Sequence, residues 1–497
     1  MLTFSKYIER FYSRLRDILN QEKSFYFVIF LAAFFLRLLP EIIIPTYPVG
    51  YETITYYVPA MIRPEVLSAF PLSIFDHLAF IGTQKPLLDT FRAGPLFYVL
   101  MWSLSDLTGA NSFLLLKIVG PLLYGFLGIS FFIFVRRVLK FDLKTALFTV
   151  LLLIFQIATL RESWDRHRDI LSISFLFFTL TAMSSKNSKQ KYVLTIILSI
   201  FTVLSRDYIG FLLLLTVLGY TFYLKKEKIK NLILFAPTTG ILLIIFNEVY
   251  LHWNYLSTSS PFFLPDYWFA VQDSFAIFFS CYLLLLPLVL KGFRKNRLLT
   301  PLLVWLLLGS FSFILFPWFA IPGYQRWLML LVFPFVIFSV WGLVKINLGK
   351  RKKKILTIVL LLHIALGTAY STGVFSFIGY VPNSYVPISL VQTSIEWDHV
   401  EELKTASNWL QENDQINSIL LVEERFYGWI MITLDLQNNN SLILVYGANS
   451  LISSVLDEAI RSGPDQIYLI WYTNSNIEHF INVYSQENLS VFSYDPN

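Results

Sequence analysis

The chain has 497 residues, of which 56% are hydrophobic, 17% aromatic and only 14% charged. Soluble domains carry about a quarter charged residues. Together with the mean hydropathy of +0.60, this composition excludes an ordinary soluble protein, a disordered chain and a disulfide scaffold. The lone Cys281 cannot form an intramolecular disulfide.

Apolar runs repeat along most of the chain and are typical of membrane-spanning helices. The sequence predicts a polytopic α-helical membrane protein with about eleven transmembrane helices. We expect them at 24–44, 112–135, 143–160, 170–183, 192–204, 208–224, 231–250, 274–290, 298–316, 327–344 and 355–375. The amphipathic stretch before the first run carries five basic residues, so the N-terminus is expected on the cytoplasmic face.

The charges fall into two populations. Residues 379–497 contain fifteen acidic and three basic residues, a balance of −12, which leaves +18 for the rest of the chain. Short basic clusters separate the apolar runs, at 136–140, 186–191, 225–230, 291–297 and 350–354. This positive-inside pattern predicts a multi-pass cell-membrane protein with these clusters in the cytoplasm, and it disfavours nucleic acid as a partner.

The positions of the basic clusters decide whether the apolar run at 94–107 crosses the membrane, because each added span moves every later cluster to the other side. Counting it as a span would place every later cluster outside, so we predict a short helix at the outer surface instead. Residues 45–111 then form one long external loop, and the C-terminal region is extracytoplasmic. We therefore expect a transmembrane domain at 1–378 and a small α/β domain at 379–497, where helical and strand-like patterns alternate.

The first candidate for chemistry is Glu52, just beyond the first span. Pro48 and Gly50 turn the chain before it, and tyrosines surround it. A carboxylate in an apolar setting suits general-base catalysis. The alternative is an interfacial side chain that faces water among the tyrosines of a membrane belt.

A second candidate is the charged stretch 161–169, which is expected to form a short outer loop between two spans. Asp165 and Asp169, with His167 or Glu162, could bind Mg²⁺ or Mn²⁺. The three arginines in the same stretch argue against a metal, because they would neutralise the carboxylates or hold an anionic phosphate instead. Both interpretations stay open, as does a purely structural ion-pair cluster.

Two arginines at outer helix ends form the third candidate. Arg206 has Asp207 beside it, whereas Arg326 has no acidic neighbour in sequence. A guanidinium at the outer end of a membrane helix could bind a lipid-linked phosphate through two hydrogen bonds. The alternative is an anchor to phospholipid headgroups.

This layout resembles the GT-C superfamily of polytopic membrane glycosyltransferases, with an acidic residue soon after the first span, a charged second external stretch, an outer arginine and a C-terminal external domain. The resemblance implies a lipid-linked sugar donor, usually on polyprenyl or dolichyl phosphate, and a catalytic role for the carboxylate at Glu52. Many members have Asp there. An acceptor on the outer face is also implied, which could be a glycan, a lipid or a protein.

The C-terminal region is distantly similar to the oligosaccharyltransferase catalytic subunit, which carries Trp-Trp-Asp-Tyr-Gly. Only Tyr427 and Gly428 agree with that motif. We expect substrate binding by Arg326, Arg206, His167 and Tyr427, a metal at Asp165 and Asp169, and sugar transfer with inversion. Transfer to protein Asn and a non-enzymatic flippase of lipid-linked saccharide remain alternatives, although the charges gather at the outer surface and not at the bilayer midplane as in transporters.

Overall fold

The computed structural model describes residues 22–44, 46–62, 94–185, 189–223, 232–250, 267–321, 323–345, 350–372, 390, 395, 397–413, 418–434, 442–446 and 452–495. The chain divides into two compact units. Unit 1 comprises Met1–Pro45, Ala93–Phe97 and Lys117–Phe375, and unit 2 comprises Thr46–Arg92, Tyr98–Leu116 and Ser376–Asn497. The predicted N-terminal amphipathic stretch at 1–21, residues 63–93 of the external loop, the basic cluster at 225–230 and part of the cluster at 186–191 lie outside the described residues.

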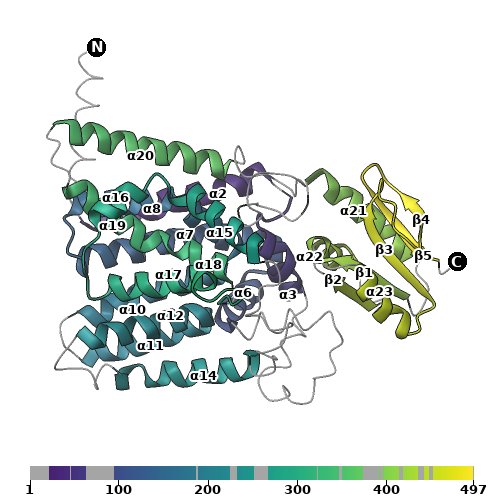
Figure 1. The fold of residues 1–497 in the computed structure, drawn as a ribbon, viewed down its shortest axis with the longest axis horizontal. Coiled ribbons are helices and arrows are strands. Elements are labelled where there is room, and N and C mark those ends of the chain that lie inside the picture. Colours follow the sequence, from purple (N-terminus) through teal and green to yellow (C-terminus); the bar gives the residue numbers. More distant parts are fainter. Residues whose placement is uncertain are drawn as a thin grey trace, which may run out of the picture. The chain divides into compact units, whose positions relative to one another are not determined.

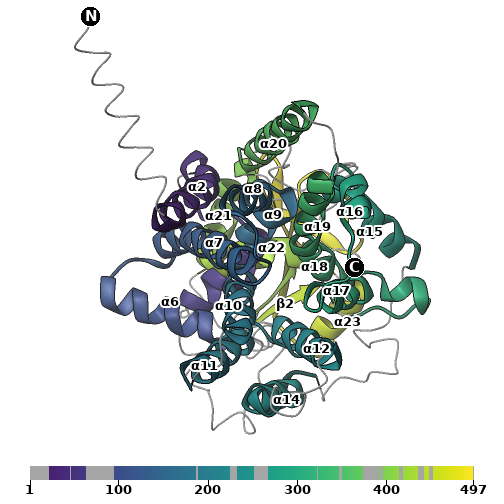
Figure 2. The same ribbon diagram turned by 90° about the vertical axis from the view of Figure 1, so that its left-hand side faces the viewer.

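Unit 1 is helical (Figure 1), and in Figure 2 many of its helices are seen nearly along their axes. Its helices are α2 (Glu22–Ile43), α7 (Ser112–Arg137), α8 (Leu143–Ile154), α9 (Ile157–Asp165), α10 (His167–Ser184), α11 (Lys189–Ser205), α12 (Asp207–Tyr223), α14 (Ala236–Tyr250), α15 (Tyr267–Tyr282), α16 (Leu286–Gly292), α17 (Leu299–Leu315), α18 (Tyr324–Leu330), α19 (Val332–Lys345) and α20 (Lys350–Ser371). Helix α6 (Pro95–Thr108) covers the run expected to be a short helix.

Three helices of the described residues are long and apolar enough to cross a membrane: Ser24–Ile43, Ser112–Arg137 and Tyr324–Lys345. Two bent pairs, α8 with α9 (59°) and α15 with α16 (79°), raise the number to five if each pair is one span. The expected eleven spans are therefore not confirmed as a number. Several of the predicted runs form apolar helices of only 10–17 residues, which is short for a bilayer core of about 30 Å.

Where these helices break, side chains donate hydrogen bonds to backbone carbonyls. Gln156, at the break between α8 and α9, donates a side-chain hydrogen bond to the carbonyl of Cys281 at the end of α15. The Tyr282 hydroxyl donates to the carbonyls of Leu328 (2.8 Å) and Met329 (2.9 Å), just before the α18–α19 break. Irregular backbone is tolerated at membrane depth only when such groups are satisfied within the protein.

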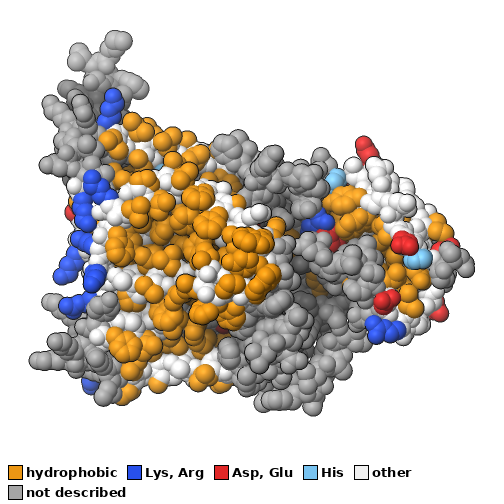
Figure 3. All heavy atoms as spheres, in the orientation of Figure 1, with side chains coloured by type: hydrophobic (Ala, Val, Ile, Leu, Met, Phe, Trp, Pro, Cys, Tyr) orange, Lys and Arg blue, Asp and Glu red, His pale blue; other side chains and the backbone are white. Residues whose placement is uncertain are grey.

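Figure 3 shows lysines and arginines gathered at one end of unit 1, and hydrophobic side chains over the rest of the side in view. Exposed basic residues in this unit include Arg137, Lys140, Lys291, Lys295 and Lys354. Long exposed hydrophobic side chains, such as Phe222 (71% exposed) and Leu361 (58%), are what a lipid-facing surface requires.

Unit 2 contains a five-stranded sheet in the order β2-β1-β3-β5-β4. Its strands are β1 (Ser418–Glu423), β2 (Leu442–Tyr446), β3 (Gln466–Tyr472), β4 (Phe480–Ser485) and β5 (Leu489–Tyr494), and its helices are α21 (Trp397–Asn413), α22 (Glu424–Thr433) and α23 (Ile452–Arg461). Strands β2, β1 and β3 are parallel, while β5 and β4 are antiparallel to their neighbours. The predicted small C-terminal α/β fold is confirmed.

Unit 2 also holds the segment after the first span. A π-helix, η1 (Thr53–Tyr57), and α3 (Val58–Ile62) follow Gly50, whose φ of +132° only glycine adopts easily. Helix α22 packs closely on η1, because a Cβ at Gly428 would lie 2.5 Å from the Ile54 carbonyl oxygen. Tyr47 makes an edge-to-face contact with Trp429 of α22 at 5.0 Å.

Candidate functional site

Unit 1 contains a cluster of buried charges, which we call the charged cluster. All the side chains of the charged cluster are more than 90% buried, with the exception of Arg326. Its members come from α2, α9, α10, the junction of α11 and α12, and α18: Arg37, Glu41, Arg161, Glu162, Asp165, Arg166, His167, Arg168, Asp169, Arg206, Asp207 and Arg326.

Three ion pairs of the charged cluster join residues four apart in sequence, two within a helix and one between α9 and the residue that caps its C-terminus. Arg37 Nη1 donates to Glu41 Oε1 at 2.7 Å in α2. Arg161 pairs with Asp165, and Arg166 pairs with Glu162. Residues four apart lie on the same helix face, so each charge meets its partner without a tertiary contact.

Other contacts join the helices. Asp169 forms an ion pair with Arg206, in which Oδ1 lies 3.1 Å from Nε, and its Oδ2 accepts a hydrogen bond from the Tyr208 hydroxyl at 2.5 Å. Arg206 also lies 3.9 Å from Asp207. Arg326 is close enough to Glu162 to act on it electrostatically, which places α18 beside α9 in the charged cluster.

His167 is buried and its ring stacks on that of Phe97, with centroids 5.8 Å apart. A Cβ at Gly120 of α7 would lie 2.7 Å from His167 Nε2 and 3.1 Å from Arg37 Nη2. Glycine at 120 therefore makes room for two members of the charged cluster. Arg37 is held in turn by a hydrogen bond from its Nε to the carbonyl of Ser163 at 3.1 Å.

The expectation of an outer loop at 161–169 was wrong. The residues belong to α9 and α10, with a break at Arg166, where φ is −118° and ψ is 57°. Pairing within and between helices neutralises the charges, so the stretch is buried and helical. The structure brings Asp165, His167, Asp169 and the two arginines into one cluster of unit 1.

The carboxylates predicted to bind metal are engaged by cations instead. Asp165 pairs with Arg161 within α9, and Asp169 of α10 pairs with Arg206 at the junction of α11 and α12. The described residues contain no group of three or more His, Cys, Asp or Glu side chains arranged to hold a metal ion. The donor set around Asp165 and Asp169 does not fit Mg²⁺ or Mn²⁺, which prefer several oxygen ligands.

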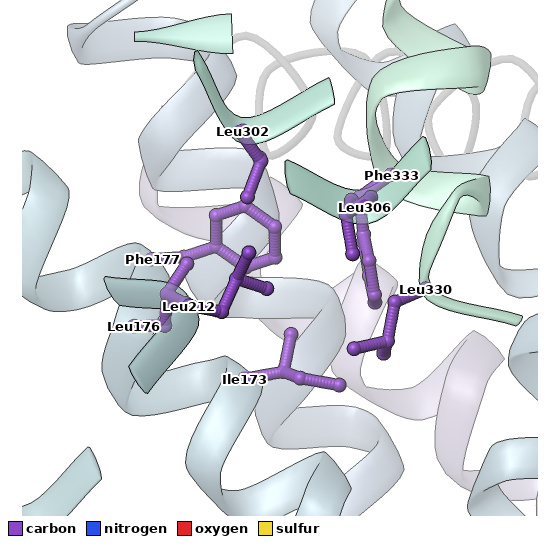
Figure 4. A pocket seen from close by; sticks show the side chains of 8 residues that line it. All are labelled: Ile173, Leu176, Phe177, Leu212, Leu302, Leu306, Leu330 and Phe333. Atoms are coloured by element: carbon purple, nitrogen blue, oxygen red, sulfur yellow. The ribbon is translucent and has the colours of Figure 1, made fainter. Parts of the chain in front are cut away.

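A small apolar pocket follows the charged cluster along three helices (Figure 4). Ile173 lies one turn beyond Asp169, Leu212 one turn beyond Tyr208, and Leu330 one turn beyond Arg326. All the lining side chains are hydrocarbon: Ile173, Leu176, Phe177, Leu212, Leu302, Leu306, Leu330 and Phe333. A charged region thus gives way to an apolar one within a single helical turn.

The other candidates lie in unit 2. Glu52 is 7% exposed and precedes the first residue of η1, and Tyr427 is buried in α22, which packs on η1. Short π-helices occur frequently at functional sites. Burial, and then the charge of Glu401, raise the pKa of Tyr47 in the same unit.

The comparisons with known proteins address the fold. No protein-family profile matches the sequence, and no curated protein matches it. The structure is similar to ArnT from Cupriavidus metallidurans in the apo state, with a TM-score of 0.54, 12% identity, and coverage of 94% of this chain and 97% of ArnT. It is also similar to two cryo-EM structures of the R1389S mutant of arabinofuranosyltransferase AftD from Mycobacteria. The TM-score is 0.53 at 10% identity for class 2 and 0.50 at 11% identity for class 1.

The chain has the GT-C fold. The similarity to AftD covers 96% of this chain but only 42% of AftD, so the chain spans about two fifths of that protein. The GT-C resemblance expected from the sequence is confirmed at the level of the fold. Sequence reasoning missed Arg37 and Glu41, although opposite charges four residues apart inside an apolar run are a signal of a buried polar site.

Proposed function

We propose that this chain is a membrane glycosyltransferase. It would transfer a sugar from a polyprenyl- or dolichyl-phosphate-linked donor to an acceptor on the extracytoplasmic side, with inversion at the sugar carbon. The observation that carries the proposal is the fold, which is similar to those of ArnT and of AftD, an arabinofuranosyltransferase, over 94% and 96% of the chain. The N-terminus would be cytoplasmic and the C-terminal domain extracytoplasmic.

The charged cluster supports binding of a phosphate. It contains six arginines and five carboxylates among the described residues, so it carries one excess positive charge before any contribution from His167. Arg326 is partly exposed, and a guanidinium binds phosphate oxygens in a bidentate manner. The side chains that line the small pocket one turn away are all hydrocarbon, so the charged cluster borders an apolar region, as a phosphate attached to a lipid would require.

Glu52 would act as the general base. The acceptor hydroxyl oxygen attacks the anomeric carbon, the bond from that carbon to the phosphate oxygen breaks, and its electron pair leaves with the phosphate. Glu52 takes the hydroxyl proton, and the phosphate leaves as an anion that a guanidinium can stabilise. A single displacement of this kind inverts the sugar carbon.

The test uses Glu52→Gln in the full-length protein, purified into nanodiscs. The amide cannot accept a proton as a carboxylate does, so transfer of sugar from a radiolabelled polyprenyl-phosphate donor should fall at least 100-fold while donor binding is retained. Glu401→Gln, an exposed carboxylate of unit 2, is the matched control and should transfer normally. Wild-type transfer by Glu52→Gln would remove Glu52 from the mechanism, and no transfer by the wild type from any such donor would overturn the proposal.

A further inference from the structure

The α/β domain has a feature that the proposed transfer does not use. Strand β1 lies between β2 and β3, and all three are parallel. The connection after β1 leads to β2 on one side, whereas the one after β3 leads to β4 at the other end of the sheet (Figure 1). In open α/β sheets, ligands bind at the carboxyl ends of the strands beside such a switch point.

Aromatic rings gather at this point. Trp471 and Tyr472 are the last residues of β3, and both are partly exposed. Phe426, in the first turn of α22 after β1, contacts Trp471 at 6.0 Å and Tyr472 at 5.8 Å between ring centroids. His399 of α21 lies 6.0 Å from Tyr472. The edge of the sheet thus presents partly exposed rings supported by a buried one.

A rigid polar pair accompanies the rings. Glu423, the last residue of β1, is fully buried and accepts two hydrogen bonds from Arg425, from Nε at 2.5 Å and from Nη2 at 2.6 Å. Arg425 Cζ lies 6.0 Å from the Trp471 ring centroid. The bidentate geometry fixes the guanidinium beside the indole before any ligand arrives.

The chemistry of these groups selects the ligand. Aromatic faces stack on the C–H faces of sugar rings, and the guanidinium of Arg425, held in place by the buried Glu423, is a hydrogen-bond donor for sugar hydroxyls. An anionic ligand is disfavoured, because Glu423 neutralises Arg425 and the domain carries a balance of −12. We propose that the switch point of β1 and β3 binds a neutral saccharide. It would be the acceptor glycan, an assignment that rests on the proposed function.

The test measures saccharide binding without transfer. The full-length protein, in nanodiscs without glycosidic detergent, is applied to an array of immobilised neutral oligosaccharides of hexoses and pentoses. Wild type should be retained on at least one glycan, and Trp471→Ala should reduce its affinity at least ten-fold, whereas Trp471→Phe should keep most of it. Trp409→Ala is the matched control, because Trp409 stacks on Tyr484 at 5.2 Å and lies about 15 Å along α21 from His399.

The outcomes separate this inference from the proposed function. Binding by wild type and by Glu52→Gln, with loss in Trp471→Ala alone, supports the saccharide site. Retention of no glycan by the wild type, or equal affinity in Trp471→Ala, overturns the inference, even if sugar transfer is intact. Glycan binding in a protein that transfers sugar from no donor would overturn the proposed function and leave this site standing. Equal melting temperatures of the variants show that any loss is not unfolding.

Discussion

Arg326 differs from the other arginines of the charged cluster in its exposure. The others are at least 92% buried, and Arg37, Arg161, Arg166 and Arg206 pair with carboxylates, whereas Arg326 is partly exposed at the start of α18. We expect Arg326→Gln to weaken binding of a polyprenyl-phosphate donor about ten-fold, since a charge-assisted hydrogen bond contributes about 1.5–3 kcal/mol. Donor titration in nanodiscs measures the change.

The control for this prediction removes the same charge elsewhere in unit 1. Arg294 is exposed and lies over the Trp341 ring at 3.6 Å. Arg294→Gln should leave donor affinity unchanged. An equal loss in both variants would mean that Arg326 acts only through net charge, and no loss in Arg326→Gln would exclude it from phosphate binding.

Glu402 links α21 to the start of β5. Partial burial raises the pKa of Glu402, but hydrogen bonds from the Asn488 backbone and side chain and from the Leu489 backbone outweigh it, so the pKa is lowered from its ordinary value of 4.5. A lowered folded-state pKa means that the stabilisation is complete above about pH 4.5 and is lost as the pH falls below it.

Glu402→Gln should therefore destabilise the α/β domain by roughly 1 kcal/mol at neutral pH. The difference from wild type should shrink below pH 4.5, where the wild-type carboxylate takes up a proton. Hydrogen exchange of the Asn488 and Leu489 amides, compared at each pH, measures it. Glu412→Gln, exposed on the same helix, should behave as wild type, and a pH-independent difference would contradict the assignment.

At the scale of elements, the helix breaks of unit 1 depend on a few side chains. Tyr282→Phe removes the donor to the Leu328 and Met329 carbonyls and leaves the ring in place. A buried acceptor without its partner costs about 1–3 kcal/mol, so we expect a lower melting temperature in detergent. Tyr26→Phe is the control, because the Tyr26 ring packs edge-on against Phe132 at 5.4 Å. Equal melting of both variants would show that the α18–α19 break does not need the hydroxyl.

Apolar patterning predicts where the helices lie but not where they break. The run at 143–160 was expected to be one span, and it forms α8 and α9 with Gln156 between them. The break is stable because Gln156 reaches the carbonyl of Cys281, a contact across 125 residues that no local pattern reveals. Helix α22 was likewise missed, since its packing on η1 depends on Gly428 meeting a distant segment.

For the whole molecule, the proposed topology can be tested with single cysteines. Cys281 is buried and should give little background labelling. In intact cells, a membrane-impermeant maleimide should label Glu478→Cys, which is exposed in the α/β domain, and should label Lys295→Cys only after permeabilisation. The reason is that basic clusters are retained on the cytoplasmic side. Labelling of Lys295→Cys in intact cells would invert the orientation.

The sequence predicts which residues belong to the candidate site better than it predicts their burial and their partners. Charge density alone selected Asp165, His167 and Asp169, and the outer arginines were chosen for their place against the positive-inside trend. Their burial could not be predicted, because the partners that make it favourable, such as Arg37 and Tyr208, come from other helices. Sequence spacing predicts ion pairs between residues four apart on a helix. The pair between Asp169 and Arg206 can be seen only in the tertiary structure, because the two residues are far apart in sequence.

This distinction bears on how the chain enters the bilayer. The pairs Arg37–Glu41 and Arg161–Asp165 form inside one helix, and Glu162 pairs with Arg166 at the C-terminal end of the same helix, so these charges can enter lipid already neutralised by local partners. The pair between Asp169 and Arg206 forms only when α10 meets the junction of α11 and α12. We therefore expect that encounter to accompany the insertion of these helices and to couple them in membrane assembly.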